Sequence, residues 1–154
     1  MGSIRLETVI KAPIERCFDL ARSVDVHIAS TAMTNERVVA GKSHGLLGLG
    51  ESVTWEGRHF GVRLRQRATI TRFDPPHVFI DESNSGPLRA MRHTHQFVKE
   101  RDRTLMVDTF EYELPLGGFG RIADRLVIER HLKRFLQERA SFLKAAAERS
   151  GGGG

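Results

Sequence analysis

Two histidines one residue apart, His93 and His95, are the residues of this chain best placed to do chemistry. Side chains in a strand alternate between the two faces of a sheet, so both imidazoles share a face with Met91 and Phe97. If those two apolar residues face a core, the imidazoles face it too. They could then act as metal ligands, as general acids and bases, or as polar groups that line a pocket.

A second alternating segment, residues 105–114, supplies a carboxylate and a phenol. Asp108 and Tyr112 share one face, while the charged Glu111 and Glu113 share the other. We therefore expect Asp108 and Tyr112 to point inward. A carboxylate, a phenol and two imidazoles would then converge near one cavity.

This set of groups suits two functions. A histidine beside Asp108 could abstract a proton next to a carbonyl, and Tyr112 or an arginine could stabilise the enolate that forms. The same groups would equally orient the polar end of a bound lipid or aromatic molecule, and we favour binding over catalysis. The candidate catalytic residues are His93, His95, Asp108 and Tyr112.

Metal binding is the third possibility for the histidines. Their backbones would be about 7 Å apart, which allows both to ligate one ion. Asp108 or His59 could supply a third ligand, but no pattern in the sequence fixes that geometry, and we predict neither a metal nor another cofactor. The single cysteine, Cys17, excludes a zinc site with several cysteines, and we expect a buried, inert thiol.

Elements expected from the hydrophobic pattern must position these groups. Period-two alternation and turn residues predict seven strands, and Pro13 suits the start of a helix. The expected strands cover 4–12, 35–41, 51–60, 64–73, 77–83, 88–97 and 105–114, and a hairpin turn is expected at 61–63. One expected helix begins at Pro13, a second covers Val24–Ser30 and a third covers 121–148. Strands followed by one long amphipathic helix indicate an α+β protein.

The overall composition suits one domain over residues 1–149, followed by a disordered glycine tail at 150–154. We find neither a membrane-spanning stretch nor a signal peptide, so we predict a cytoplasmic protein. The net charge of +5 permits nucleic-acid binding. The arginines at 65 and 67 alternate with Leu64, Gln66 and Ala68 and lack interleaved aromatic residues, so we predict a solvated face and no nucleic-acid partner. An interaction protein that uses this arginine face is a remaining alternative.

Several segments resemble one family. They are WEGRHFG (55–61), ITRFDPPHVFIDE (70–82), HTHQF (93–97) and DTFEYELPLGGFGRIADRL (108–126). They are similar to stand-alone bacterial members of the SRPBCC superfamily, which includes START lipid-transfer domains, pollen-allergen-like proteins and polyketide cyclase/dehydrase proteins. The resemblance implies a helix-grip fold: a curved seven-stranded antiparallel sheet wrapped around a long C-terminal helix, with two short helices after the first strand and an apolar cavity.

The function that the resemblance implies is binding of a small hydrophobic molecule between sheet and helix, by a monomer or homodimer. A cyclase/dehydrase that uses a His–Asp pair is the alternative. We expect the ligand-binding residues to be Trp55, His59, Met91, Phe97, Phe110, Leu126 and Phe135. Asp81 and Glu82 are assigned no role, and the isolated histidines at 27, 44, 77 and 131 are expected at the surface.

Overall fold

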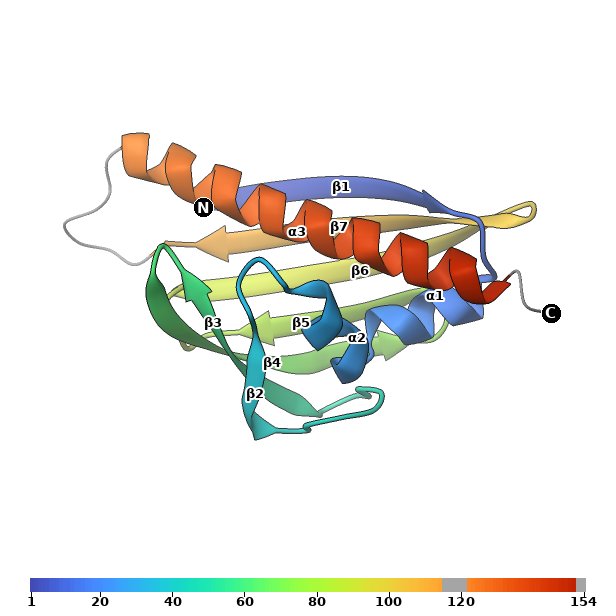
Figure 1. The fold of residues 1–154 in the computed structure, drawn as a ribbon, viewed down its shortest axis with the longest axis horizontal. Coiled ribbons are helices and arrows are strands. Elements are labelled where there is room, and N and C mark those ends of the chain that lie inside the picture. Colours follow the sequence, from blue (N-terminus) through green and yellow to red (C-terminus); the bar gives the residue numbers. More distant parts are fainter. Residues whose placement is uncertain (115–121, 152–154) are drawn as a thin grey trace.

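A computed structural model describes residues 1–114 and 122–151 as one antiparallel sheet with three helices (Figure 1). The elements in chain order are β1 (Gly2–Ile10), α1 (Ile14–Ala21), α2 (Val24–Ser30), β2 (Arg37–Gly41), β3 (Ser52–His59), β4 (Val62–Asp74), β5 (Val78–Ser83), β6 (Ala90–Glu100), β7 (Arg103–Glu113) and α3 (Ile122–Gly151). The α+β class and the predicted order of strands and helices are confirmed.

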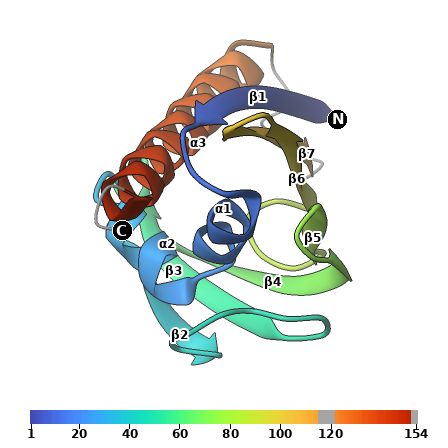
Figure 2. The same ribbon diagram turned by 90° about the vertical axis from the view of Figure 1, so that its right-hand side faces the viewer.

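The seven strands form one sheet in the order β1-β7-β6-β5-β4-β3-β2, and every neighbouring pair is antiparallel. The sheet curves around α1, and α3 crosses its open side (Figure 2). Strands β5, β6 and β7 therefore lie in the interior of the sheet, next to one another. Any side chain on their inner face points toward the helices.

Local sequence explains how the elements begin and end. Pro13 precedes α1, and the hydroxyl of Ser23 accepts a hydrogen bond from the Val26 amide at the start of α2. The β3–β4 turn consists of Phe60 and Gly61, both with positive φ. Positive φ at both positions gives a two-residue hairpin turn the twist that matches its flanking strands. The turn thus lies one residue earlier than predicted, because β4 already begins at Val62.

The main core surrounds Phe18 of α1. Its ring contacts Phe79 and Phe97, with ring centroids 5.4 and 5.5 Å away. Leu143 of α3 belongs to the same buried cluster. Cys17 is fully buried there, as predicted, and burial raises the pKa of its thiol.

A second buried cluster lies under the other half of α3. It contains Ile4, Met91, Phe110, Tyr112 and Leu136. Toward its N-terminal end, α3 also exposes about half of the surface of Leu126 and Val127. The two halves of this helix therefore pack differently against the sheet.

Hydrogen bonds hold the C-terminal half of α3 in place. Arg16 of α1 donates to the Ala147 carbonyl at 3.0 Å, and Lys144 donates to the Val9 carbonyl at 2.6 Å. Further toward the N-terminus, His131 meets His59 of β3, with their ring nitrogens 2.8 Å apart. The C-terminal half is thus fastened to α1 and β1. The described side chains of the preceding half instead meet the sheet through the His131–His59 bond, ring contacts of His131 and Phe135, and apolar packing.

The ends of α3 bear on two predictions. The helix continues to Gly151, two residues into the predicted 150–154 tail, and residues 152–154 lie outside the described part of the chain. Pro115, which the sequence predicts as the end of the last strand, and the segment LGGFG that follows it, for which its glycines predict flexibility, also lie outside the described residues. Among the described helices, none is long and apolar enough to cross a membrane.

The buried and exposed faces of β6 can be distinguished by their effects on stability. Replacing Phe97, which is 2% exposed, with alanine should lower the free energy of unfolding by about 3–5 kcal/mol, because it leaves a cavity beside Phe18. Replacing its neighbour Val98, which is 49% exposed, should cost less than about 1 kcal/mol. Urea denaturation of both variants measures the difference, and equal losses would contradict the assigned face of β6.

Candidate functional site

Four ionisable side chains meet on the inner face of the three central strands. They are Asp81 of β5, His93 and His95 of β6, and Asp108 of β7. In the strand register Asp81 lies opposite His93, and His95 lies opposite Asp108. Both histidines are 4% exposed and Asp108 is 7% exposed, so all three point inward. We call these four residues the His–Asp cluster.

His95 is held between two carboxylates. Its Nε2 lies 2.8 Å from an oxygen of Asp81, and its Nδ1 lies 3.1 Å from an oxygen of Asp108. An ionised carboxylate only accepts hydrogen bonds, so both ring nitrogens of His95 must carry a proton. Burial by itself would lower the pKa of His95, but the bonds to Asp108 and Asp81 outweigh burial and raise it. His95 is therefore an imidazolium.

His93 has the opposite character. Burial and then the neighbouring charge of His95, whose ring centroid is 3.8 Å away, lower the pKa of His93. Its Nε2 lies 3.1 Å from Asp108 and must donate to that carboxylate. Within the described residues its Nδ1 has no hydrogen-bond partner. His93 is therefore a neutral imidazole with a free lone pair.

The two carboxylates of the cluster stay ionised. Burial would raise the pKa of each carboxyl group. Hydrogen bonds from His95 lower the pKa of Asp81 instead, and those from both histidines lower that of Asp108 well below its ordinary value. With one imidazolium and one neutral imidazole, the His–Asp cluster carries a net charge of about −1. The two histidines of this one site thus differ in protonation: His95 is charged and His93 is neutral.

A second polar cluster lies beside the first, between α2, β3 and α3. Nε2 of His27 is 2.8 Å from Glu36, and the His27 ring stacks on Trp55 with centroids 3.7 Å apart. His59 lies 3.8 Å from the same carboxylate and also contacts His131. The expectation that His27 and His131 lack companions at the surface is wrong, because α2 folds onto β3 and α3 crosses above it.

Burial and the His27–Glu36 hydrogen bond determine the charges of the second cluster. Burial, and then the charge of Arg139, lower the pKa of His27 to about 4. Burial would raise the pKa of Glu36, but its hydrogen bond to His27 lowers it. At neutral pH a neutral imidazole therefore donates to an ionised carboxylate.

A small cavity separates the two clusters. Its volume is about 30 Å³, which holds about one or two water molecules. It lies between α1, α2, β6, β7 and α3 and is lined by Leu20, Ala21, Val26, His27, Ser30, His93, His95, Met106, Asp108, Leu136, Arg139, Ala140 and Leu143. The resemblance implied a ligand-sized space, typically roughly 300 Å³ or more. The observed space is much smaller because apolar side chains of α1 and α3 fill it.

The structure separates one candidate catalytic residue from the others. Tyr112 points inward as predicted, but it lies four residues beyond Asp108 on β7, a separation of about 13 Å along a strand. Its ring packs near Phe110 in the second apolar cluster, and burial raises its pKa. The phenol is not part of the His–Asp cluster.

The predicted ligand-binding residues divide into groups. Phe110 packs its ring edge against His93, and Met91 and Phe135 belong to the apolar cluster around it. Trp55 and His59 line the second polar cluster instead. Phe97 packs in the main core against Phe18, and Leu126 is 52% exposed on α3. None of the seven predicted residues is among those that line the 30 Å³ cavity.

Metal ligation is geometrically open to three of the residues. Donor atoms of Asp81, His93 and His95 all lie within 4.8 Å of one another. In the observed arrangement, however, Nε2 of His95 and Nε2 of His93 are both hydrogen-bonded to carboxylates. An ion would have to displace these bonds, and the prediction of no metal remains a prediction.

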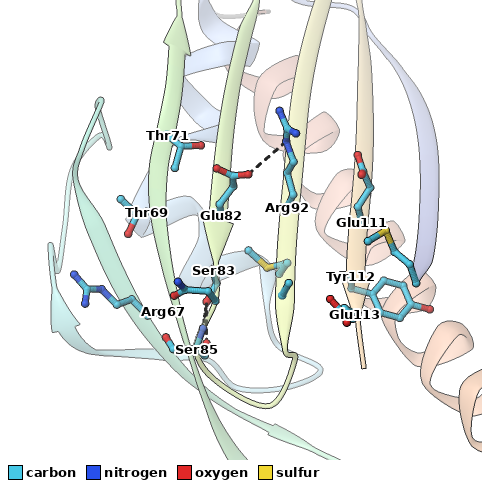
Figure 3. Close-up of a pocket in the computed structure, with 14 residues that line it drawn as sticks. Arg67, Thr69, Thr71, Glu82, Ser83, Ser85, Arg92, Glu111, Tyr112 and Glu113 are labelled. Atoms are coloured by element: carbon cyan, nitrogen blue, oxygen red, sulfur yellow. Dashed lines mark hydrogen bonds and ion pairs between the residues drawn. The ribbon is translucent and has the colours of Figure 1, made fainter. Parts of the chain in front are cut away.

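A larger hollow of about 700 Å³ lies elsewhere, mainly over the outer face of β4 to β7 (Figure 3). Charges of both signs line it, and Arg92 lies 3.6 Å from Glu82 across it. Beyond it, Arg65 and Arg37 both bind the carboxylate of Glu56. Because acidic partners interrupt the arginine face, no continuous basic surface forms there.

Sequence reasoning missed three groups beside the cavity. Asp81 was assigned no role, although it shares strand parity with Phe79, whose ring stacks on His95 at 4.1 Å. That parity was the one available signal. Glu36 and Arg139 carried no comparable signal, because only the crossing of α2 and α3 over the sheet brings them close.

The low pKa of His27 makes stability depend on pH. In the unfolded chain His27 takes up a proton near pH 6.5, whereas in the folded chain it does so only near pH 4. Lowering the pH across this window therefore favours unfolding, at about 1.4 kcal/mol for each unit of pKa difference. In His27→Gln, we expect the stability lost between about pH 7 and pH 4.5 to shrink by about 2–3 kcal/mol.

Urea denaturation at the two pH values measures this change. His44→Gln is the matched control, because His44 is exposed in the loop between β2 and β3. The free energy of unfolding of this control variant should change with pH as it does in the unmodified protein. An unchanged pH dependence in His27→Gln would show that His27 is accessible to protons in the folded state.

Comparisons with known proteins address the fold. No protein-family model and no curated protein sequence matches the chain. Among solved structures, an aromatase/cyclase from a Streptomyces species aligns with a TM-score of 0.79 and 16% identity, over 99% of this chain and 98% of that one. A protein from Thermus thermophilus aligns with a TM-score of 0.74 and 23% identity, over 95% and 99% of the two chains.

A plant protein has the same architecture. Major latex-like protein 151 from Panax ginseng aligns with a TM-score of 0.65 and 14% identity, over 95% of this chain and 97% of that one. At such low identities these similarities establish a shared fold and no shared reaction. Together with the observed sheet order and the position of α3, they show that the chain has the helix-grip fold that the resemblance implied.

Proposed function

We propose that the chain binds a small, mostly apolar molecule between α3 and the sheet, with its polar end against the His–Asp cluster. One observation carries this proposal: the charged His95 and Asp108 are buried in the wall of a cavity that is otherwise mainly apolar, and the Asp81 carboxylate pairs with His95 from the neighbouring strand. Burying each charge costs several kcal/mol, and apolar residues would often stabilise a core better. Perturbed ionisable groups beside a cavity are typical of functional sites.

The apolar part of the ligand needs more room than the observed cavity gives. The hydrogen bonds that fasten α3 lie in its C-terminal half, at Lys144 and Ala147. Ahead of them the helix meets the sheet through His131 and apolar side chains such as Phe135 and Leu136. We infer that this half of α3 moves outward to admit the ligand, which then contacts Met91, Phe110 and Leu136.

The comparisons support the same function. The helix-grip fold is shared with the plant latex-like protein and with the aromatase/cyclase, and both solved structures align over nearly their full lengths. A curved sheet closed by one long helix provides an interior site in such an architecture. The cytoplasmic location, the absence of a nucleic-acid partner and the monomeric or homodimeric state remain predictions.

Binding can be tested with N-phenyl-1-naphthylamine, an apolar dye that fluoresces strongly when it leaves water. We expect the protein to bind it saturably. Ala140→Phe should weaken binding by about tenfold or more, because Ala140 lines the cavity and a phenyl ring there would fill it.

Ala145→Phe is the matched control, since Ala145 is exposed on the same helix. It should leave the affinity within about twofold. Melting curves of both variants show whether they remain folded. No saturable dye binding to the folded unmodified protein, or equal loss in both folded variants, would overturn the proposed site.

A second candidate function is catalysis of proton transfer next to a carbonyl. The observation that favours it is the free Nδ1 of His93, with its opposite nitrogen fixed by Asp108. Nδ1 would take a proton from the carbon beside the carbonyl. The C–H electrons would form the C=C bond of an enolate, and the carbonyl π electrons would move to oxygen. The His95 imidazolium supplies positive charge beside that site.

Hydrogen–deuterium exchange tests this second function. In deuterium oxide, the protein should speed exchange of the methyl hydrogens of 2-acetylnaphthalene, as followed by proton NMR. His93→Gln should remove most of that acceleration, and we expect a loss of about a hundredfold. His77→Gln, in an exposed turn, is the control. Exchange at the uncatalysed rate with the unmodified protein would leave binding as the function.

A further inference from the structure

Arg139 of α3 presents a hydrogen-bond donor that the protein itself does not use. Its side chain lines the 30 Å³ cavity, and its Nε is buried. Within the described residues that nitrogen has no hydrogen-bond partner. Leaving a buried donor unpaired is costly, so a retained example needs an explanation such as a bound oxygen atom.

Contacts of the guanidinium group show where the Arg139 side chain lies. Its guanidinium carbon lies 6.0 Å from the ring centroid of Phe135, one helical turn earlier on α3. Its charge also influences the pKa values of His27, Glu36 and Asp81, which places it between the two polar clusters. Arg139 therefore lies beside the space that separates them.

The charges around the cavity indicate what kind of oxygen would bind. Glu36, Asp81 and Asp108 are negative, whereas His95 and Arg139 are positive, so the surroundings carry a net charge of about −1. A ligand anion would add a further negative charge to a poorly hydrated site. A neutral acceptor oxygen would use the free Nε–H group without that penalty.

We propose that Arg139 binds a neutral carbonyl oxygen of the ligand through its Nε–H group, so that the chain selects apolar molecules that carry a ketone. This inference rests on the proposed function and names the ligand class for it. The carbonyl group fits within the existing cavity, while the apolar remainder lies under the displaced half of α3. On another wall of the cavity, His93 then faces the carbons next to the carbonyl.

The test uses 6-propionyl-2-(dimethylamino)naphthalene, whose emission moves to longer wavelength when its carbonyl accepts a hydrogen bond. Bound to the unmodified protein, it should show this hydrogen-bonded emission. In Arg139→Gln and Arg139→Lys the emission should move to shorter wavelength, and affinity should fall by about tenfold or more. The lysine variant keeps the charge but removes the Nε–H donor.

Two controls separate this role from a structural one. Arg134→Gln alters an arginine of the same helix that is 74% exposed and pairs with Glu138, and it should change neither emission nor affinity. N-phenyl-1-naphthylamine has no carbonyl, so its affinity for both Arg139 variants should stay within about twofold of the unmodified protein. Equal weakening of both dyes would show a structural role and overturn the inference.

Failure of this inference can be told apart from failure of the proposed function. If the carbonyl-free dye binds and the ketone dye keeps its emission and affinity in both Arg139 variants, the binding site stands and the role of Arg139 is refuted. If neither dye binds the unmodified protein, the proposed function fails, and this inference fails with it.

Discussion

The imidazolium of His95, held between Asp81 and Asp108, is the interaction on which the interior of this protein depends. It offsets two carboxylates that burial would otherwise protonate or expel, and it connects three adjacent strands through their side chains. Together with burial, it also keeps His93 neutral, because a second positive charge on a ring 3.8 Å away is unfavourable. One buried cation thus produces both the charge balance of the cavity and the free base within it.

This arrangement separates two tasks that a binding site must combine. Apolar residues around Phe110 and Leu136 provide contact area without choosing among apolar molecules. The polar walls provide direction, since each donor and acceptor has a fixed position and most are already paired within the protein. The groups left over, a donor on Arg139 and an acceptor on His93, are therefore the ones that can distinguish ligands.

Much of the fold followed from local patterns in the sequence, and part of the site did as well. Alternation placed His93, His95 and Asp108 on the inner face, and the α2 bounds agree with those predicted. The partner of His95 was missed, because a lone aspartate near a strand end is equally compatible with solvent until the β5–β6 register is known. His27, Glu36 and Arg139 converge only through the crossing of helices over the sheet, which no local pattern encodes.

The uneven attachment of α3 has a thermodynamic consequence. The four members of the His–Asp cluster all belong to β5, β6 and β7, so the cluster is complete whether or not the N-terminal half of α3 is docked. Opening is then a local equilibrium within an intact sheet, and the apparent dissociation constant equals the intrinsic one divided by the open fraction. Substitutions on the far side of α3 would consequently tune affinity for every ligand alike, while selectivity stays with the strands and Arg139.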